Sequence, residues 1–109
     1  MEDIIKEALS KGVELHKVGQ LGLAKELYDT VIRLEPRHAD ANYNKGVIAI
    51  ETGHVSEALP LLSIALEENP DHAQYWISYI DALIRHVAVD DARNMLALAK
   101  QKGAEGEAF

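Results

Sequence analysis

A shift of 34 residues brings this sequence into register with itself, and that internal repeat constrains the fold more than any other feature. The matched positions share lysine, small residues and proline, and they are Lys11/Lys45, Gly12/Gly46, Gly19/Gly53, Ala24/Ala58/Ala92 and Pro36/Pro70. A third copy is weaker but keeps Ala39 over Ala73 and Ala65 over Ala99. A period of this length is typical of repeat arrays, in which each unit packs on its neighbours. We therefore divide the chain into units 5–38, 39–72 and 73–106.

Each unit has the hydrophobic spacing of two consecutive helices. Leu23, Leu27, Val31 and Leu34 recur every three or four residues, which is the period of a helix with one apolar face. Glycine-containing breaks at 19–20 and 53–54 separate the helices, and Pro36 and Pro70 close the first two units. In the third unit the pattern predicts one helix near 73–86 and another near 89–102.

Two glycines lie inside predicted helices at the same position of consecutive units. Gly12 and Gly46 each cost a helix about 1 kcal/mol relative to alanine. Glycine at one repeat position in two units indicates a close approach of neighbouring helices that leaves no room for a Cβ atom. Ala24, Ala58 and Ala92 are the matching small residues on the second helix of each pair.

Composition narrows the function classes. The 109 residues contain no cysteine and carry a formal net charge of −7, with eleven scattered basic residues, so we expect no nucleic-acid partner. No apolar run is long enough to cross a membrane, and we expect a cytoplasmic protein without membrane partner or cofactor. The five histidines have no metal-ligand spacing, and no catalytic motif occurs, so we expect neither a metal site nor enzymatic activity.

These residues together resemble the tetratricopeptide repeat family over nearly the whole chain. The family's pattern appears in the first unit as Ala8, Lys11-Gly12, Leu15, Ala24, Tyr28 and Pro36, and in the second as Asn42, Lys45-Gly46, Ala49, Ala58, Leu62 and Pro70. In the third unit Trp76 stands at the opening aromatic position. Three residues depart from the pattern there: Ile80 replaces the packing glycine, Val87 the turn glycine, and Ala104 the closing proline.

The resemblance implies an all-α fold, a right-handed superhelix (solenoid) of three antiparallel helix pairs. Residues 1–109 would form one domain with a short tail at 107–109. In the family the opening aromatic packs inside its helix pair, so Trp76 is expected in the core. The first helices of the pairs would line a concave groove, the usual ligand surface of such arrays.

Mapping the family's groove onto this chain gives a surface with an apolar centre and a polar fringe. The residues expected to bind a ligand are Leu9, Val13, Lys17, Tyr43, Asn44, Val47, Ile50, Ile77 and Asp81. The family's carboxylate clamp for chaperone tails needs lysine and asparagine on the first groove helix, asparagine on the second, and lysine and arginine on the third. The matching positions hold Leu9, Val13, Asn44, Gln74 and Ser78, so only the asparagine of the second helix is kept. Without these cations a terminal carboxylate has little to bind, so an apolar or amphipathic peptide is the expected ligand.

The sequence therefore predicts a protein–protein interaction module with no catalysis. An alternative is that these repeats recognise substrates for a larger glycosyl- or sulfotransferase-type enzyme, since residues 75–83, together with 103–109, resemble repeats that precede such domains in bacteria. We also expect a weak homodimer through the C-terminal helix. Too few residues follow that helix to cap the apolar face around Met95, Leu96 and Leu98.

Overall fold

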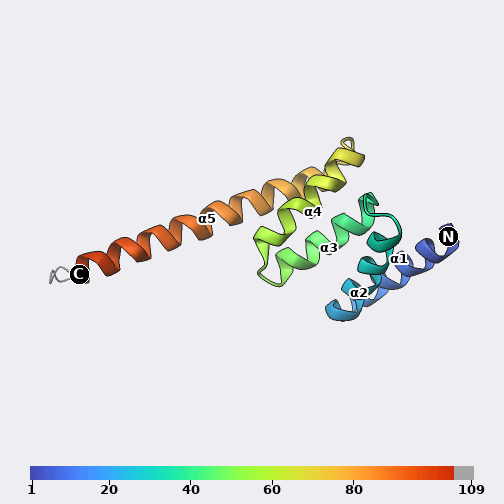
Figure 1. Cartoon of the computed structure of the whole chain (residues 1–109), viewed down its shortest axis with the longest axis horizontal. Helices are drawn as coiled ribbons and strands as arrows, with labels where there is room; N and C mark the ends of the chain where they lie inside the picture. Colours follow the sequence, from blue (N-terminus) through green and yellow to red (C-terminus); the bar gives the residue numbers. More distant parts are fainter. Residues whose placement is uncertain (105–109) are drawn as a thin grey trace.

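The computed structural model describes residues 1–104 and contains five helices there and no strand. They are α1 (Glu2–Lys17), α2 (Leu21–Leu34), α3 (Ala39–Glu51), α4 (Val55–Glu68) and α5 (Ala73–Ala104), which follow one another along an elongated body (Figure 1). The all-α solenoid fold predicted from the repeat is confirmed. The predicted tail at 107–109, and the last two residues of the third unit, lie outside the described residues.

The first two units end their first helix in the same way. Gly19 and Gly53 both adopt φ +82°, a left-handed conformation that side chains with a Cβ rarely tolerate. The amide of Gln20 then donates to the carbonyl of Leu15 at 2.9 Å, and that of His54 to Ala49 at 2.7 Å. These bonds satisfy carbonyls that the end of a helix leaves free, and they turn the chain back into α2 and α4.

Close helix packing explains the two glycines inside helices. A Cβ added to Gly12 would lie 2.7 Å from Cε1 of Tyr28, and one added to Gly46 would lie 2.9 Å from Cδ2 of Leu62. Tyr28 and Leu62 are themselves fully buried. The close approach predicted from the repeated glycine is therefore confirmed, with α1 packed on α2 and α3 packed on α4.

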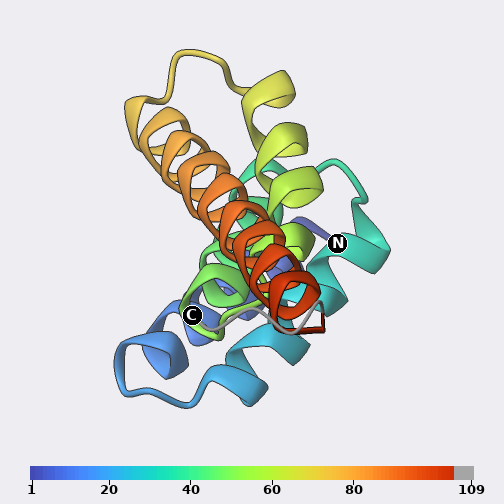
Figure 2. The same ribbon diagram turned by 90° about the vertical axis from the view of Figure 1, so that its left-hand side faces the viewer.

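The third unit departs from the predicted pair of helices. Residues 73–104 form one continuous helix of 32 residues instead of separate helices at 73–86 and 89–102, so α5 projects beyond α4 (Figures 1 and 2). The physical reason is Val87, which stands where the first two units have Gly19 and Gly53. A β-branched residue disfavours the positive φ of that turn and is compatible with continued helix.

Because α5 does not fold back, two predictions for the third unit are wrong. Trp76 was expected in the core of a helix pair but is 46% exposed, and its indole Nε1 donates to the carbonyl of Pro70 at 2.6 Å. Ala92 is exposed, whereas the matching Ala24 and Ala58 are fully buried. The principal extents of 65 × 29 × 21 Å reflect this projecting helix.

Candidate functional site

A hollow of about 460 Å³ lies between α1 and α3, on the side of these helices that the repeat pattern assigned to the groove. We call it the α1/α3 groove, and its lining residues are Lys6, Leu9, Ser10, Val13, Glu14, Lys17, Asp40 and Asn44. The residues from α1 recur every three or four positions and so share one face of the helix. Four of the nine residues predicted to bind a ligand are brought together here: Leu9, Val13, Lys17 and Asn44.

The floor of the α1/α3 groove is apolar and partly accessible. Leu9 and Val13 are both half-buried, and Leu9 also packs against the core clusters that contain Val31 and Ile48. Leu9 is therefore held in place by the core while part of its surface remains open. A floor fixed in this way needs little reorganisation to receive an apolar side chain.

Polar groups of both signs surround this floor. Lys6 and Lys17 lie on α1, and Asp40 and Asn44 lie on α3. The hydroxyl of Tyr75 on α5 donates to the Asp40 carboxylate, which fixes one wall of the groove to the third unit. Burial of the ring raises the pKa of the Tyr75 phenol, and the hydrogen bond to Asp40 raises it further. Near Lys17, Nε2 of His16 and Oε1 of Glu51 lie 2.7 Å apart and join α1 to α3.

The structure places the other predicted residues outside this hollow. Tyr43 lies against α5, where its ring stacks on Tyr75 and its hydroxyl lies 3.1 Å from Oγ of Ser78. Ile50 packs against the core cluster of Ala49, Ala58, Leu62 and Ala82, and Val47 is half-buried on α3. Neither predicted residue on α5 lines the hollow: Ile77 is 59% exposed, and Asp81 accepts from Arg85 of its own helix at 3.0 Å.

Glu14 is a lining residue that sequence reasoning missed. Its carboxylate lies 3.7 Å from Nζ of Lys11, one turn away on α1. The matching residue of the second unit is Ile48, which is buried. Repeat comparison therefore gave no reason to include position 14, and only its helical spacing from Ser10 and Lys17 could have placed it at the groove.

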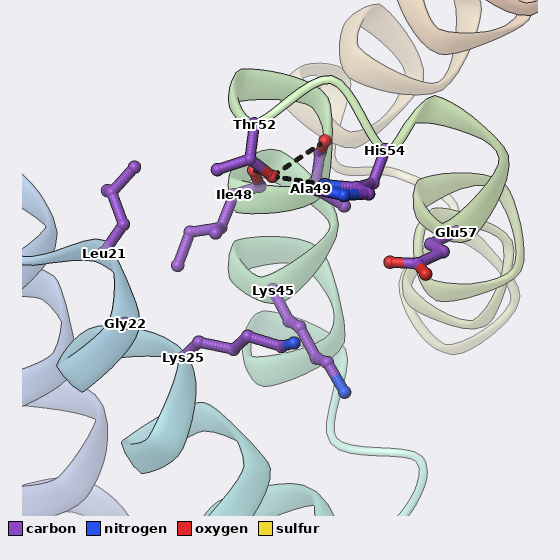
Figure 3. A pocket seen from close by; sticks show the side chains of 9 residues that line it. All are labelled: Leu21, Gly22, Lys25, Lys45, Ile48, Ala49, Thr52, His54 and Glu57. Carbon is purple, nitrogen blue, oxygen red and sulfur yellow. Dashed lines mark hydrogen bonds between the residues drawn. The ribbon is translucent and has the colours of Figure 1, made fainter.

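A second hollow, of about 360 Å³, lies among α2, α3 and α4 and was not predicted from the sequence (Figure 3). Its lining residues are Leu21, Gly22, Lys25, Lys45, Ile48, Ala49, Thr52, His54 and Glu57. Lys25 of α2 and Lys45 of α3 both line it (Figure 3), and Nζ of Lys45 is paired with Asp29 at 2.6 Å. Nδ1 of His54 is hydrogen-bonded to Oγ1 of Thr52 at 3.0 Å. Two polar groups of this hollow are thus engaged with neighbouring side chains, and Lys25 and Glu57 add two more charged groups to its lining.

Within residues 1–104 no group of three or more histidine, aspartate or glutamate side chains is arranged to hold a metal ion. Nor does any helix in that range have the length and apolar character needed to span a bilayer.

The comparison with known families fits this architecture. A family model described as tetratricopeptide repeat matches residues 15–79, more than half of the chain. The chain therefore belongs to the tetratricopeptide repeat family, whose repeats are generally protein–protein interaction modules and typically non-catalytic. No curated protein matches the sequence.

Proposed function

We propose that the α1/α3 groove binds a short apolar or amphipathic peptide segment of a partner protein. The observation that carries the proposal is the apolar floor of Leu9 and Val13, open to solvent at the bottom of a hollow with polar walls. In a chain whose family consists of interaction modules, a preformed concave site of this kind favours peptide recognition over catalysis.

The groove supplies both the affinity and the orientation that a peptide needs. Full burial of a leucine or valine side chain against the floor would contribute about 1.5–3 kcal/mol. The amide of Asn44 can donate to a peptide carbonyl and accept from a peptide N–H, so it suits main-chain recognition. Lys6 and Lys17 on α1, with Glu14 between them and Asp40 on α3, favour a segment that carries charges of both signs beside its apolar residue.

The remaining predicted residues extend this proposal along the array. Tyr43, Val47 and Ile50 lie on α3, and Ile77 and Asp81 on α5, so a longer segment would pass from the α1/α3 groove toward them. Their part in binding stays a prediction. The role as substrate-recognition repeats of a transferase also stays a prediction, because a peptide groove would serve a tethered substrate as well as a free one.

The test is selection of ligands from a displayed library of random peptides, followed by binding measurements on variants. Val13→Glu should reduce the affinity of the selected peptides at least about tenfold, because it places a charge on the apolar floor. Leu23→Glu is the matched control: Leu23 is 51% exposed on α2, does not line the groove, and should leave binding unchanged.

Two further readouts make the outcome decisive. Helix content by circular dichroism should be the same in both variants, so lost binding cannot be ascribed to unfolding. Amide chemical shifts of the isotope-labelled protein should change around Leu9, Val13 and Asn44 when a selected peptide is added. Peptides that bind the Val13→Glu variant as well as the wild type would refute the proposed site.

A further inference from the structure

The first half of α5 exposes a continuous apolar surface that the α1/α3 groove does not include. We call it the outer face, and it consists of Trp76, Ile77, Ile80, Leu83, Ile84 and Val87, with exposed fractions between 38% and 64%. All six side chains are large and uncharged. Ile80 matches Gly12 and Gly46, which face the second helix of their pairs. Ile77 matches Leu9 and Tyr43, which face the α1/α3 groove and α5.

The opposite side of the same helix is already packed. Tyr75, Ser78 and Ala82 are buried, in contact with α3 and α4. Because successive residues of a helix are turned by about 100°, the outer face points away from the body. A partner could therefore cover it without displacing any element of the chain.

Four residues of the outer face have the spacing of a two-helix seam. Ile77, Ile80, Ile84 and Val87 are separated by three, four and three residues, which matches the a and d positions of a heptad. All four are β-branched and more than half exposed. The next two positions of the same heptad are Asp91 and Asn94, so the apolar seam ends there.

The size of the outer face also favours an interface. Its six side chains expose on the order of 600 Å², the upper end of what a monomeric protein leaves in its largest apolar patch. Two such faces in contact would bury on the order of 1,000 Å² in total, which is the lower limit for a specific protein–protein interface. A dimer of moderate affinity is what this area can support.

We propose that the outer face is the interface between two copies of this chain, which pair through antiparallel α5 helices. In this register Ile80 lies beside Ile84 of the partner subunit, and Ile77 beside Val87 of the partner subunit. All four seam positions then contact apolar residues, and Asp91 and Asn94 stay outside the seam. A parallel pairing would instead bring the two Asp91 carboxylates together, which like charges disfavour.

Sedimentation equilibrium at physiological ionic strength tests the proposal on the full chain and two matched variants. The wild type should show a reversible monomer–dimer equilibrium. Ile84→Glu should weaken the dimer at least about a hundredfold, because it places charges in the seam. Leu96→Glu should leave the equilibrium unchanged, because Leu96 is 58% exposed, against 64% for Ile84, but lies about a third of a turn away from it around the helix. This variant separates the outer face from the face around Met95, Leu96 and Leu98 that is predicted from the sequence to form the dimer.

A strictly monomeric wild type, or a Leu96→Glu variant that dissociates as strongly as Ile84→Glu, would overturn the proposal. A double variant, Ile80→Cys with Leu96→Cys, checks for the other occupant, the chain's own residues 88–104. Ile80 and Leu96 stand at the repeat positions of Gly12/Tyr28 and Gly46/Leu62, which are in contact in the first two units. In the continuous helix α5 they are about 24 Å apart, too far for a disulfide. A disulfide within one chain would show that α5 folds back, and would also overturn the proposal. We expect none.

Discussion

Tyr43 of α3 stacks on Tyr75 of α5, with ring centroids 4.6 Å apart and an interplanar angle of 28°. Each ring also makes a polar contact across the same boundary: Tyr43 with Ser78, and Tyr75 with Asp40. On its other side Tyr75 stacks on His72, with centroids 4.1 Å apart. These contacts connect the groove wall to the third unit, so substitutions that remove single atoms can test how much they contribute to the packing of α5 on α3.

The hydroxyl of Tyr75 should contribute measurably to stability. Tyr75→Phe removes the donor to Asp40 and should lower the free energy of unfolding by about 1.5–3 kcal/mol, the range for hydrogen bonds to charged groups. Urea denaturation followed by circular dichroism measures the change. Asp40→Asn should reproduce most of the loss, and the double variant should lose less than the sum of the two single changes. Additive losses would show that the two groups do not interact.

Alkaline pH should destabilise the fold through the same tyrosine. Burial raises the pKa of Tyr75 in the folded chain above its ordinary value near 10, so the folded state keeps a proton that the unfolded state releases. The resulting stability is fully present below about pH 10 and is lost as the pH rises from there toward the folded pKa. Urea midpoints at about pH 8 and about pH 11 should differ more in the wild type than in Tyr75→Phe.

Two glycine-to-alanine changes should have opposite signs. Gly46→Ala places its Cβ 2.9 Å from Leu62 and should cost about 1–3 kcal/mol, because a packed core must shift. Gly22→Ala meets nothing within 4 Å and lies in α2, so it should stabilise by up to about 1 kcal/mol through helix propensity. Thermal unfolding of both variants measures the difference. Equal changes in stability for the two variants would mean that the contact of position 46 with Leu62 does not require a glycine.

Val87 should determine whether the third unit can close. Val87→Gly restores the residue type that turns the chain at Gly19 and Gly53, so residues 89–102 should fold back on residues 73–86 in part of the molecules. In the Ile80→Cys/Leu96→Cys background, this variant should form an intramolecular disulfide far faster than the parent. Val87→Ala is the control, because alanine favours a continuous helix. Equal rates in the glycine and alanine variants would rule out this role of residue 87.

The sequence predicted those parts of the fold that depend on backbone geometry. Gly12 and Gly46 predicted close helix contacts, and Gly19 and Gly53 predicted turns, because in each case only the missing Cβ satisfies the requirement. The prediction of two helices in the third unit was wrong because it extended the repeat past Val87, a residue that disfavours the turn. Val87 departs visibly from the repeat pattern. Whether the helix continues there depends on the free energy of continuing it relative to that of folding back to bury Trp76, and residue spacing gives neither quantity.

The groove was predictable only in part, because the same repeat position has different neighbours in each unit. Leu9 and Tyr43 occupy equivalent positions, yet Leu9 remains partly open in the α1/α3 groove whereas Tyr43 is engaged by Tyr75 and Ser78 of α5. Ile77, the third equivalent, is 59% exposed on α5. Repeat position fixes the direction of a side chain, and the residues of the next unit decide whether that direction leads to solvent or to a contact.

The continuous α5 helix has a mechanical consequence. It is packed on α3 and α4 as far as Ala82, and from Ala82 to Ala104 it spans about 33 Å. A tilt of about 10° of this projecting part would move its far end by about 6 Å for a helix of this length. Small rearrangements where α5 packs on α3, at the Tyr43–Tyr75 stack and at Ala82, would thus become larger displacements at the far end of α5.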